Sequence, residues 1–196
     1  MKDLLLAIFF ALILIPIFNF FASVKPNIFT TAAFFLLMVP TLMTLINGAP
    51  FVPTPMEAVR KMLKLAGVKK GDVVYDIGCG DGRMVYVAAN EYGANATGLE
   101  LSPLVYFFAR VRKLLWRSKA RILFRNFKHQ NFNNADLIVC YLMPETLEKL
   151  RPKLEAELKP GAKIVSYAFQ VKGWTPHHKE EKDTVMNLSP IWIYKR

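Results

Sequence analysis

A strand-like run that ends beside an acidic residue and continues into three alternating glycines constrains the fold of this chain most. Residues 73–77 read Val-Val-Tyr-Asp-Ile, and residues 78–83 read Gly-Cys-Gly-Asp-Gly-Arg. Glycine allows the tight turn that follows a buried strand, and it lets a ligand approach the backbone without a Cβ atom in the way. Because a helical pattern follows, the segment predicts a strand, a ligand-binding turn and a helix, which is the basic unit of a doubly wound sheet.

The glycine spacing indicates which ligand the turn binds. A dinucleotide-binding turn has the pattern GxGxxG, which requires glycine where this chain has Arg83. The observed GxGxG pattern favours S-adenosylmethionine (SAM), whose amino-acid end lies over such a loop. Glu100 ends the next strand-like run, 22 residues after Gly78, and a carboxylate there can accept hydrogen bonds from both ribose hydroxyls. A generic glycine turn with an exposed glutamate is the alternative interpretation.

Helix and strand patterns alternate along the rest of the domain. A helix is expected from Thr54-Pro55 to Ala66, with Gly67 ending it. Strands are expected at about 72–77, 96–101, 121–125, 136–142, 163–169, 184–188 and 191–194. The pattern predicts an α/β fold with a seven-stranded, mostly parallel, doubly wound (Rossmann-like) sheet and one reversed edge strand, as in class I methyltransferases. Its ligand should lie beyond the carboxyl ends of the central strands.

The first 48 residues form a separate, apolar part of the chain. Their only charged residues are Lys2, Asp3 and Lys25. Two uncharged runs, residues 4–22 and 27–46, are each about long enough to cross a bilayer as a helix. We expect a transmembrane helical hairpin that makes residues 1–48 a membrane anchor, followed by a SAM-dependent methyltransferase domain over residues 49–196. A single span, a hairpin within one leaflet and a cleavable signal peptide are the alternatives.

Basic residues close behind the apolar part predict its orientation. They are Arg60, Lys61, Lys64, Lys69 and Lys70, whereas the turn between the two runs carries only Lys25. The positive-inside rule therefore places a multi-pass or hairpin-anchored protein with its catalytic domain on the cytosolic face. The chain lacks an Arg- and Ser-rich presequence, which favours a prokaryotic inner membrane.

The charge of the chain is strongly positive and unevenly distributed. The net charge is +11, and residues 1–48 contribute only +1, from two lysines and one aspartate. Such a charge suits RNA or an anionic membrane surface. The helical pattern after Pro103 combines aromatic and basic residues, which could stack on RNA or could pack on the sheet with a basic edge toward lipid headgroups. With an apolar anchor in the chain, we favour membrane lipids as the partner and consider nucleic acid unlikely.

Cysteine and histidine usage predicts no metal site. The chain has two cysteines, Cys79 and Cys140, which are too few for a disulfide framework. His177 and His178 are adjacent and lack further ligands at a suitable spacing. We therefore expect no bound metal and surface positions for the two histidines.

Several motifs together resemble a known family. They are Phe51-Val52-Pro53-Thr54, residues 76–83, Gly98-Leu99-Glu100-Leu101-Ser102-Pro103 and Trp174-Thr175-Pro176. From about residue 51 onward the chain resembles membrane-anchored class I SAM-dependent protein-lysine methyltransferases, which include the enzymes acting on the ATP synthase c-subunit and on the adenine nucleotide translocase. The resemblance implies SAM-dependent N-methylation of an accessible lysine in a small membrane protein. Where relatives carry an acidic residue after the third strand, this chain has Asn126, whose carbonyl can still accept a hydrogen bond from adenine.

The candidate site residues follow from the motifs and from the chemistry. We expect SAM to contact Asp76, Gly78, Cys79, Gly80, Asp81, Gly82, Glu100, Leu101, Asn126 and Phe127. Methyl transfer to lysine requires a positioned, neutral amine, and lysine has a reference pKa of about 10.4. A desolvating aromatic channel lowers that pKa, and we expect Tyr141 and Trp174 to line it. The alternative is that both are ordinary core aromatics.

Two other functions are compatible with the sequence. One is a membrane-associated methyltransferase that acts on a lipid or a quinone. The other is an RNA-binding or RNA-methylating module on the same fold, whose binding would be sensitive to salt. The presence of Asp76, the glycine turn and Glu100 argues against loss of SAM binding in either case.

Overall fold

A computed structural model of the chain describes residues 19–20, 22–23, 27–32, 34–36 and 51–196. The predicted hairpin over residues 4–22 and 27–46 therefore lies largely outside the described residues. Within the described parts of the chain, no helix combines the length and the apolar character needed to cross a membrane. Asn27 begins a helix there, since its Oδ1 accepts hydrogen bonds from the backbone N–H groups of Phe29 and Thr30.

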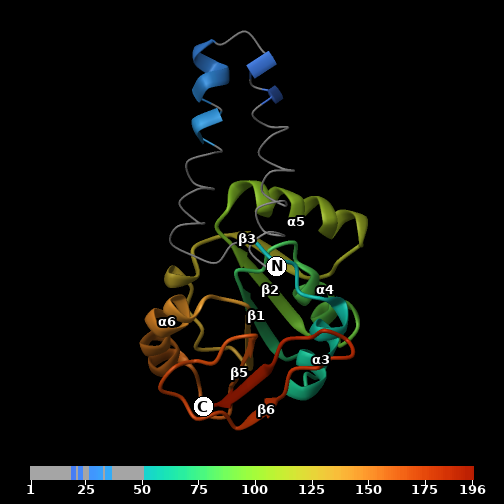
Figure 1. The fold of residues 1–196 in the computed structure, drawn as a ribbon, viewed down its shortest axis with the longest axis vertical. Coiled ribbons are helices and arrows are strands. Elements are labelled where there is room, and N and C mark those ends of the chain that lie inside the picture. Colours follow the sequence, from blue (N-terminus) through green and yellow to red (C-terminus); the bar gives the residue numbers. More distant parts are fainter. Residues whose placement is uncertain (1–18, 21, 24–26, 33, 37–50) are drawn as a thin grey trace.

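The domain after residue 50 is a seven-stranded sheet with helices on both faces (Figure 1). Its helices are α3 (Met56–Ala66), α4 (Arg83–Asn90), α5 (Pro103–Leu115) and α6 (Pro144–Glu157), with a short 3-10 helix η1 (Phe127–His129). Its strands are β1 (Val73–Ile77), β2 (Asn95–Glu100), β3 (Arg121–Phe124), β4 (Leu137–Cys140), β5 (Lys163–Tyr167), β6 (His178–Glu180) and β7 (Ile191–Lys195). The order is β3-β2-β1-β4-β5-β7-β6, so the predicted doubly wound fold is confirmed.

The predicted position of the sixth strand was wrong, whereas the seventh, expected at residues 191–194, is confirmed as β7. Strand β6 forms at His178–Glu180 and not at residues 184–188. Those later residues form a turn, because Asp183 Oδ1 accepts hydrogen bonds from the backbone N–H groups of Val185 and Met186. The reversed strand is β7, which pairs antiparallel with both β5 and β6 and therefore does not lie at the sheet edge.

The start of α3 also differs from the expected start at Thr54-Pro55. The helix begins at Met56, and no side chain caps its first turn. Thr54 is buried instead, and its carbonyl accepts a hydrogen bond of 2.6 Å from Arg83 Nη1. The predicted end is confirmed, because Gly67 adopts a left-handed conformation with φ 67°. The segment before α3 is thus joined to the first residue of α4.

Two hydrophobic clusters cover the two faces of the sheet. Residues of α3, α4 and α5 contribute to one cluster, and residues of α6 to the other. In the second cluster Phe132 is fully buried, and its ring meets that of Tyr75 edge-on at 5.3 Å. Between the clusters the parallel pairing sets Ile77 beside Leu99 and Cys140. The carboxyl ends of β1, β2 and β4 therefore meet at one edge of the sheet.

Candidate active site

The glycine turn, residues 78–82, leaves the carboxyl end of β1 and is fixed to β2 by its backbone. The N–H groups of Gly78 and Cys79 both donate to Leu99 O at 3.0 Å. Gly80 has φ +56°, and a Cβ atom there would lie 2.5 Å from Cε2 of Phe51. Only glycine fits this position, because the ring of Phe51 occupies the space that a side chain would need.

Glu100, the last residue of β2, holds the turn from the other side. Its Oε2 accepts a hydrogen bond of 3.0 Å from Gly80 N, and its Oε1 accepts from the backbone N–H groups of Leu101 and Ser102 at 2.9 and 2.8 Å. Burial raises the pKa of Glu100, although these three donors act in the opposite direction. The carboxylate oxygens retain lone pairs that can accept further hydrogen bonds from a diol.

Asp76 lies on β1 immediately before the turn, and it is buried. Within the described residues its carboxylate makes no hydrogen bond and no ion pair. Burial raises its pKa well above the usual range, and the negative charges of Glu100 and Asp81 raise it further. At this depth the ionised carboxylate requires a cationic partner, and without one Asp76 keeps its proton. SAM fits this requirement, since it carries an ammonium and a sulfonium group.

Two arginines neutralise the third carboxylate of the site, Asp81. Arg83 Nη2 donates to Asp81 Oδ2 at 2.6 Å, and Arg112 of α5 donates to the same oxygen. Arg83 lies only two positions from Asp81 in the chain, whereas Arg112 lies 31 positions away and was missed by sequence reasoning. With Asp81 paired, Asp76 and Glu100 are the two carboxyl groups of the site that have no cationic side chain beside them among the described residues. The local field therefore favours a cation over the glycine turn.

The other predicted SAM contacts lie at the ends of neighbouring strands. Asn126 follows β3, and its Oδ1 accepts a hydrogen bond of 3.0 Å from Lys128 N, which begins η1. Phe127 packs against the cluster on the α6 face, and Leu101 is exposed at the end of β2. Burial raises the pKa of the Cys79 thiol well above its usual range, so Cys79 is not a thiolate at neutral pH.

The two predicted channel aromatics are placed in different clusters. Tyr141 directly follows β4 and meets the ring of Tyr167 edge-on at 5.1 Å. Trp174 belongs to the cluster on the α6 face, where its Nε1 donates to Glu155 Oε1 at 2.6 Å and its ring lies 5.4 Å from that of Tyr194. Because Ile77 pairs with Cys140, the next residues, Gly78 and Tyr141, leave the same edge of the sheet, whereas Trp174 is bound to Glu155 of α6.

Two further residues at this edge were not among the predicted contacts. Phe51 lies against Gly80, as described above. The hydroxyl of Ser102 is buried and has no hydrogen-bond partner among the residues that the structure describes. Both belong to motifs that were recognised in the sequence, but only the folded chain shows that Phe51 packs on the glycine turn and that Ser102 shares the Glu100 carboxylate with Gly80. The same described residues contain no group of three or more His, Cys, Asp or Glu that could hold a metal ion.

A doubly wound sheet with this strand order, a glycine turn after β1 and acidic residues at the ends of β1 and β2 define a SAM-dependent methyltransferase. The comparisons with known proteins agree. The chain belongs to the family described as the ANTKMT methyltransferase domain, whose family model matches residues 76–178. It uses SAM as its cofactor.

Individual relatives extend the similarity beyond this segment. The chain is 38% identical over 137 residues to a protein-lysine N-methyltransferase of Saccharolobus islandicus, which covers 68% of this chain and 85% of that protein. It is 32% identical to the mouse lysine N-methyltransferase of the ATP synthase c-subunit, over 74% of this chain and 57% of that protein. A solved structure described as an RNA methyltransferase from Salinibacter ruber, in complex with S-adenosyl-L-homocysteine, has a TM-score of 0.68 and 32% identity, covering 74% of this chain and 93% of that one.

The raised pKa of Asp76 predicts that SAM binding depends on pH. Because the pKa of Asp76 is raised in the folded state, the carboxyl of the SAM-free protein stays protonated at pH values where an ordinary carboxyl is ionised. The free energy of unfolding of the SAM-free protein therefore falls as pH rises through the raised pKa. A bound cation favours the ionised form, so the affinity for SAM should rise by up to about tenfold per pH unit until Asp76 is ionised. Calorimetric titration with SAM over a series of pH values above the usual range of a carboxyl measures this. The Asp76→Asn variant should lack this slope, and a flat profile in the parent protein would contradict the assignment.

Proposed function

We propose that this methyltransferase acts on the side-chain nitrogen of a lysine in a small membrane protein. The observation that carries the proposal is the aromatic group beside the glycine turn, where the rings of Tyr167 and Phe169 lie 5.1 and 6.2 Å from that of Tyr141. An apolar wall of this kind desolvates a lysine ammonium and so lowers its pKa. Relatives named for lysine methylation of the ATP synthase c-subunit and of the adenine nucleotide translocase support the same substrate class.

The residues of this site can perform the parts of the reaction that belong to the protein. When bound, SAM would supply a methyl group on a positively charged sulfur: the neutral lysine nitrogen would form a bond to the methyl carbon as the bond from that carbon to sulfur breaks, which would give a methylammonium and a neutral thioether. Asp76 and Glu100 orient the donor, and the aromatic group holds the amine in its neutral form. Burial, and then Tyr167, raise the pKa of Tyr141, so its phenol stays protonated at neutral pH. The Tyr141 oxygen can therefore accept a hydrogen bond from the amine without introducing a charge.

The proposal includes the place of action. A transmembrane hairpin over residues 4–22 and 27–46 would hold the catalytic domain at the cytosolic face of a prokaryotic inner membrane. The apolar composition of residues 1–48 and the basic residues that follow them support this location. A substrate embedded in the same membrane then needs only lateral diffusion to meet the site.

RNA methylation is the second candidate. It is favoured by the 32% identity to the structure described as an RNA methyltransferase and by the positive charge of the chain. The two candidates differ in the fraction that receives the methyl group, so one experiment separates them.

The test adds methyl-labelled SAM and the purified full chain to native membranes and then separates protein, lipid and RNA. We expect label in one small hydrophobic protein, with mass spectrometry placing the methyl group on lysine. The Asp76→Asn variant, as the matched control, should incorporate about 100-fold less label. Label in RNA or lipid, with clean protein lanes, would overturn the lysine assignment while leaving the SAM site in place.

A further inference from the structure

Helix α5 exposes an apolar stripe on the side that faces away from the sheet. The stripe, here called the α5 outer face, consists of Phe107, Phe108, Val111, Leu114 and Leu115. These positions follow the i, i+4, i+7 spacing of one helical face. Leu114 and Leu115 are 79% and 74% exposed, whereas Ala109 is the buried residue of the helix. An apolar face of this size on an otherwise charged domain marks an interaction surface.

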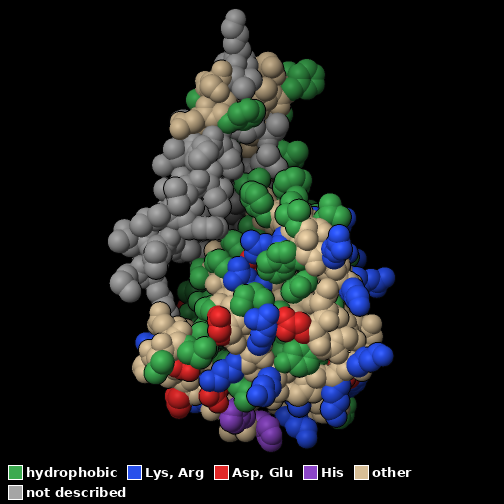
Figure 2. All heavy atoms as spheres, turned by 90° about the vertical axis from the view of Figure 1, so that its right-hand side faces the viewer, with side chains coloured by type: hydrophobic (Ala, Val, Ile, Leu, Met, Phe, Trp, Pro, Cys, Tyr) green, Lys and Arg blue, Asp and Glu red, His purple; other side chains and the backbone are tan. Residues whose placement is uncertain are grey.

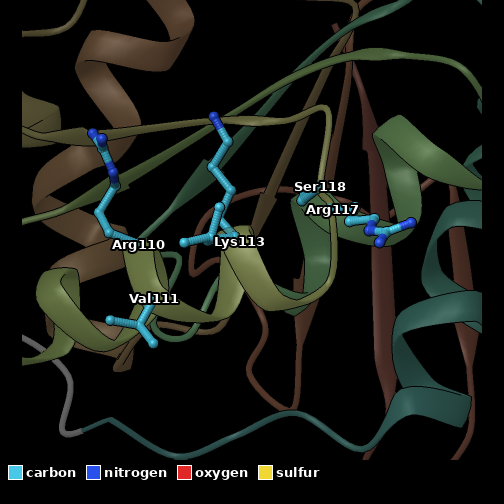
Figure 3. A pocket seen from close by; sticks show the side chains of 6 residues that line it. Arg110, Val111, Lys113, Arg117 and Ser118 are labelled. Atoms are coloured by element: carbon cyan, nitrogen blue, oxygen red, sulfur yellow. The ribbon is translucent and has the colours of Figure 1, made fainter.

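The chain segment that carries the stripe is basic and contains no acidic residue. Residues 101–135 include eight lysines and arginines and no aspartate or glutamate, so they carry +8 of the net +11. Arg110, Lys113 and Arg117 flank the stripe and line a depression of about 650 Å³ (Figure 3). Arg112 is the exception, because it turns inward to Asp81. The surface thus combines exposed hydrocarbon with uncompensated positive charge.

The position of α5 matches the proposed anchor. In Figure 1, α5 lies across the end of the domain that faces the described helical residues 28–32 and 34–36. Figure 2 shows hydrophobic side chains, with lysines and arginines beside them, gathered toward the same end. Ile28 and Phe29 in those helical residues are themselves exposed and apolar. One end of the molecule therefore carries both sets of apolar side chains.

We propose that the α5 outer face docks on the surface of an anionic phospholipid bilayer. Phe107, Leu114 and Leu115 enter the boundary between headgroups and acyl chains, while the flanking cations bind lipid phosphates. RNA fits less well, because the phosphate backbone offers no apolar phase to bury the exposed leucines. The inference rests on the proposed action at the membrane and adds the element that orients the domain there. Since Arg112 joins α5 to Asp81, the docked helix also supports the glycine turn.

The test uses the full chain reconstituted into vesicles, with an environment-sensitive dye on a Leu114→Cys variant. Cys79 and Cys140 are both buried, so the introduced thiol is the reactive one. We expect the emission to shift to shorter wavelength in vesicles with about 30% phosphatidylglycerol and to shift less in phosphatidylcholine alone. The same dye on Val185→Cys, which is 94% exposed in a turn outside α5, should report water in both lipids.

Variants with reversed charges test whether the basic residues of α5 are responsible for docking on the bilayer. Reversal of the three flanking cations (Arg110→Glu, Lys113→Glu and Arg117→Glu) should lower the ratio of docked to undocked protein by about 100-fold. A matched reversal elsewhere (Lys64→Glu, Lys149→Glu and Lys182→Glu), at exposed positions, should leave that ratio nearly unchanged. SAM affinity confirms that both variants are folded.

Several outcomes would overturn the docking proposal. They are an unshifted dye at position 114 in anionic vesicles, an equal loss in the matched charge variant, and a shift caused by RNA but not by lipid. The methylation assay in the same vesicles keeps the two proposals apart. Docking without lysine methylation refutes the proposed substrate alone, and lysine methylation without docking refutes the role of α5 alone.

Discussion

Replacement of Asp76 by asparagine should stabilise the free protein and at the same time remove most of its affinity for SAM. The substitution removes a buried carboxylate whose pKa is raised by burial and by two neighbouring carboxylates, so the free energy of unfolding should increase by about 1 kcal/mol. The same change deletes the anionic partner of the cofactor, which should weaken SAM binding by about 10- to 100-fold. Thermal unfolding and calorimetric titration of the detergent-solubilised chain measure the two effects.

A gain in stability together with a loss of SAM affinity is specific to a residue that binds the cofactor. Asp183→Asn is the matched control, because asparagine keeps the oxygen that accepts the two backbone hydrogen bonds of its turn, and neither stability nor SAM affinity should change there. If Asp76→Asn bound SAM as tightly as the parent protein, then Asp76 would not be the partner of the cationic donor. A loss of stability together with the loss of affinity would indicate a structural role instead.

Glu100→Ala should reduce methyl transfer by about 100-fold or more and also loosen the glycine turn. The carboxylate accepts hydrogen bonds from three backbone N–H groups, those of Gly80, Leu101 and Ser102, and charged hydrogen bonds of this kind contribute about 1.5–3 kcal/mol each. Glu100→Gln keeps one oxygen acceptor and should lose only about tenfold. Initial rates with labelled SAM give both values.

A ribose analogue separates the two roles of Glu100. The parent protein should bind S-adenosyl-L-homocysteine more tightly than its 2′-deoxy analogue, because only the former offers the hydroxyl to the carboxylate. Glu100→Ala should bind both equally. An alanine variant that kept the preference for the hydroxyl would show that Glu100 only positions the turn and does not contact the ribose.

The site residues that could be predicted from the sequence are those whose positions are set by residues next to them in the chain. The turn after β1 and the carboxylate that ends β2 were predictable, because glycine spacing and strand patterns are local properties. Arg112 was not, since its contact with Asp81 depends on how α5 crosses the domain. Trp174 was expected in the channel from its position after β5; the structure places its Nε1 against Glu155 of α6, and its role in the channel stays a prediction.

The same distinction between local signals and tertiary contacts explains why the sixth strand was predicted at residues 184–188 and not at His178–Glu180. Residues 184–188 have an apolar composition that suits a strand, yet the Asp183 side chain satisfies the backbone in a turn. Strand β6 is short and mostly exposed, and it forms because β7 offers an unpaired edge to His178–Glu180. A strand that depends on its partner has little signal of its own.

The packing of Phe51 on Gly80 has a consequence for the choice of lysine. Phe51 follows Gly48, the last residue of the proposed anchor, by three positions, which span at most about 10 Å even when extended. In a membrane-anchored enzyme the methyl donor is then held at a nearly constant height above the bilayer. Such an enzyme selects a lysine by the distance of its amine from the lipid surface. Proteins of unrelated sequence are then equally good substrates when they present a lysine at that distance.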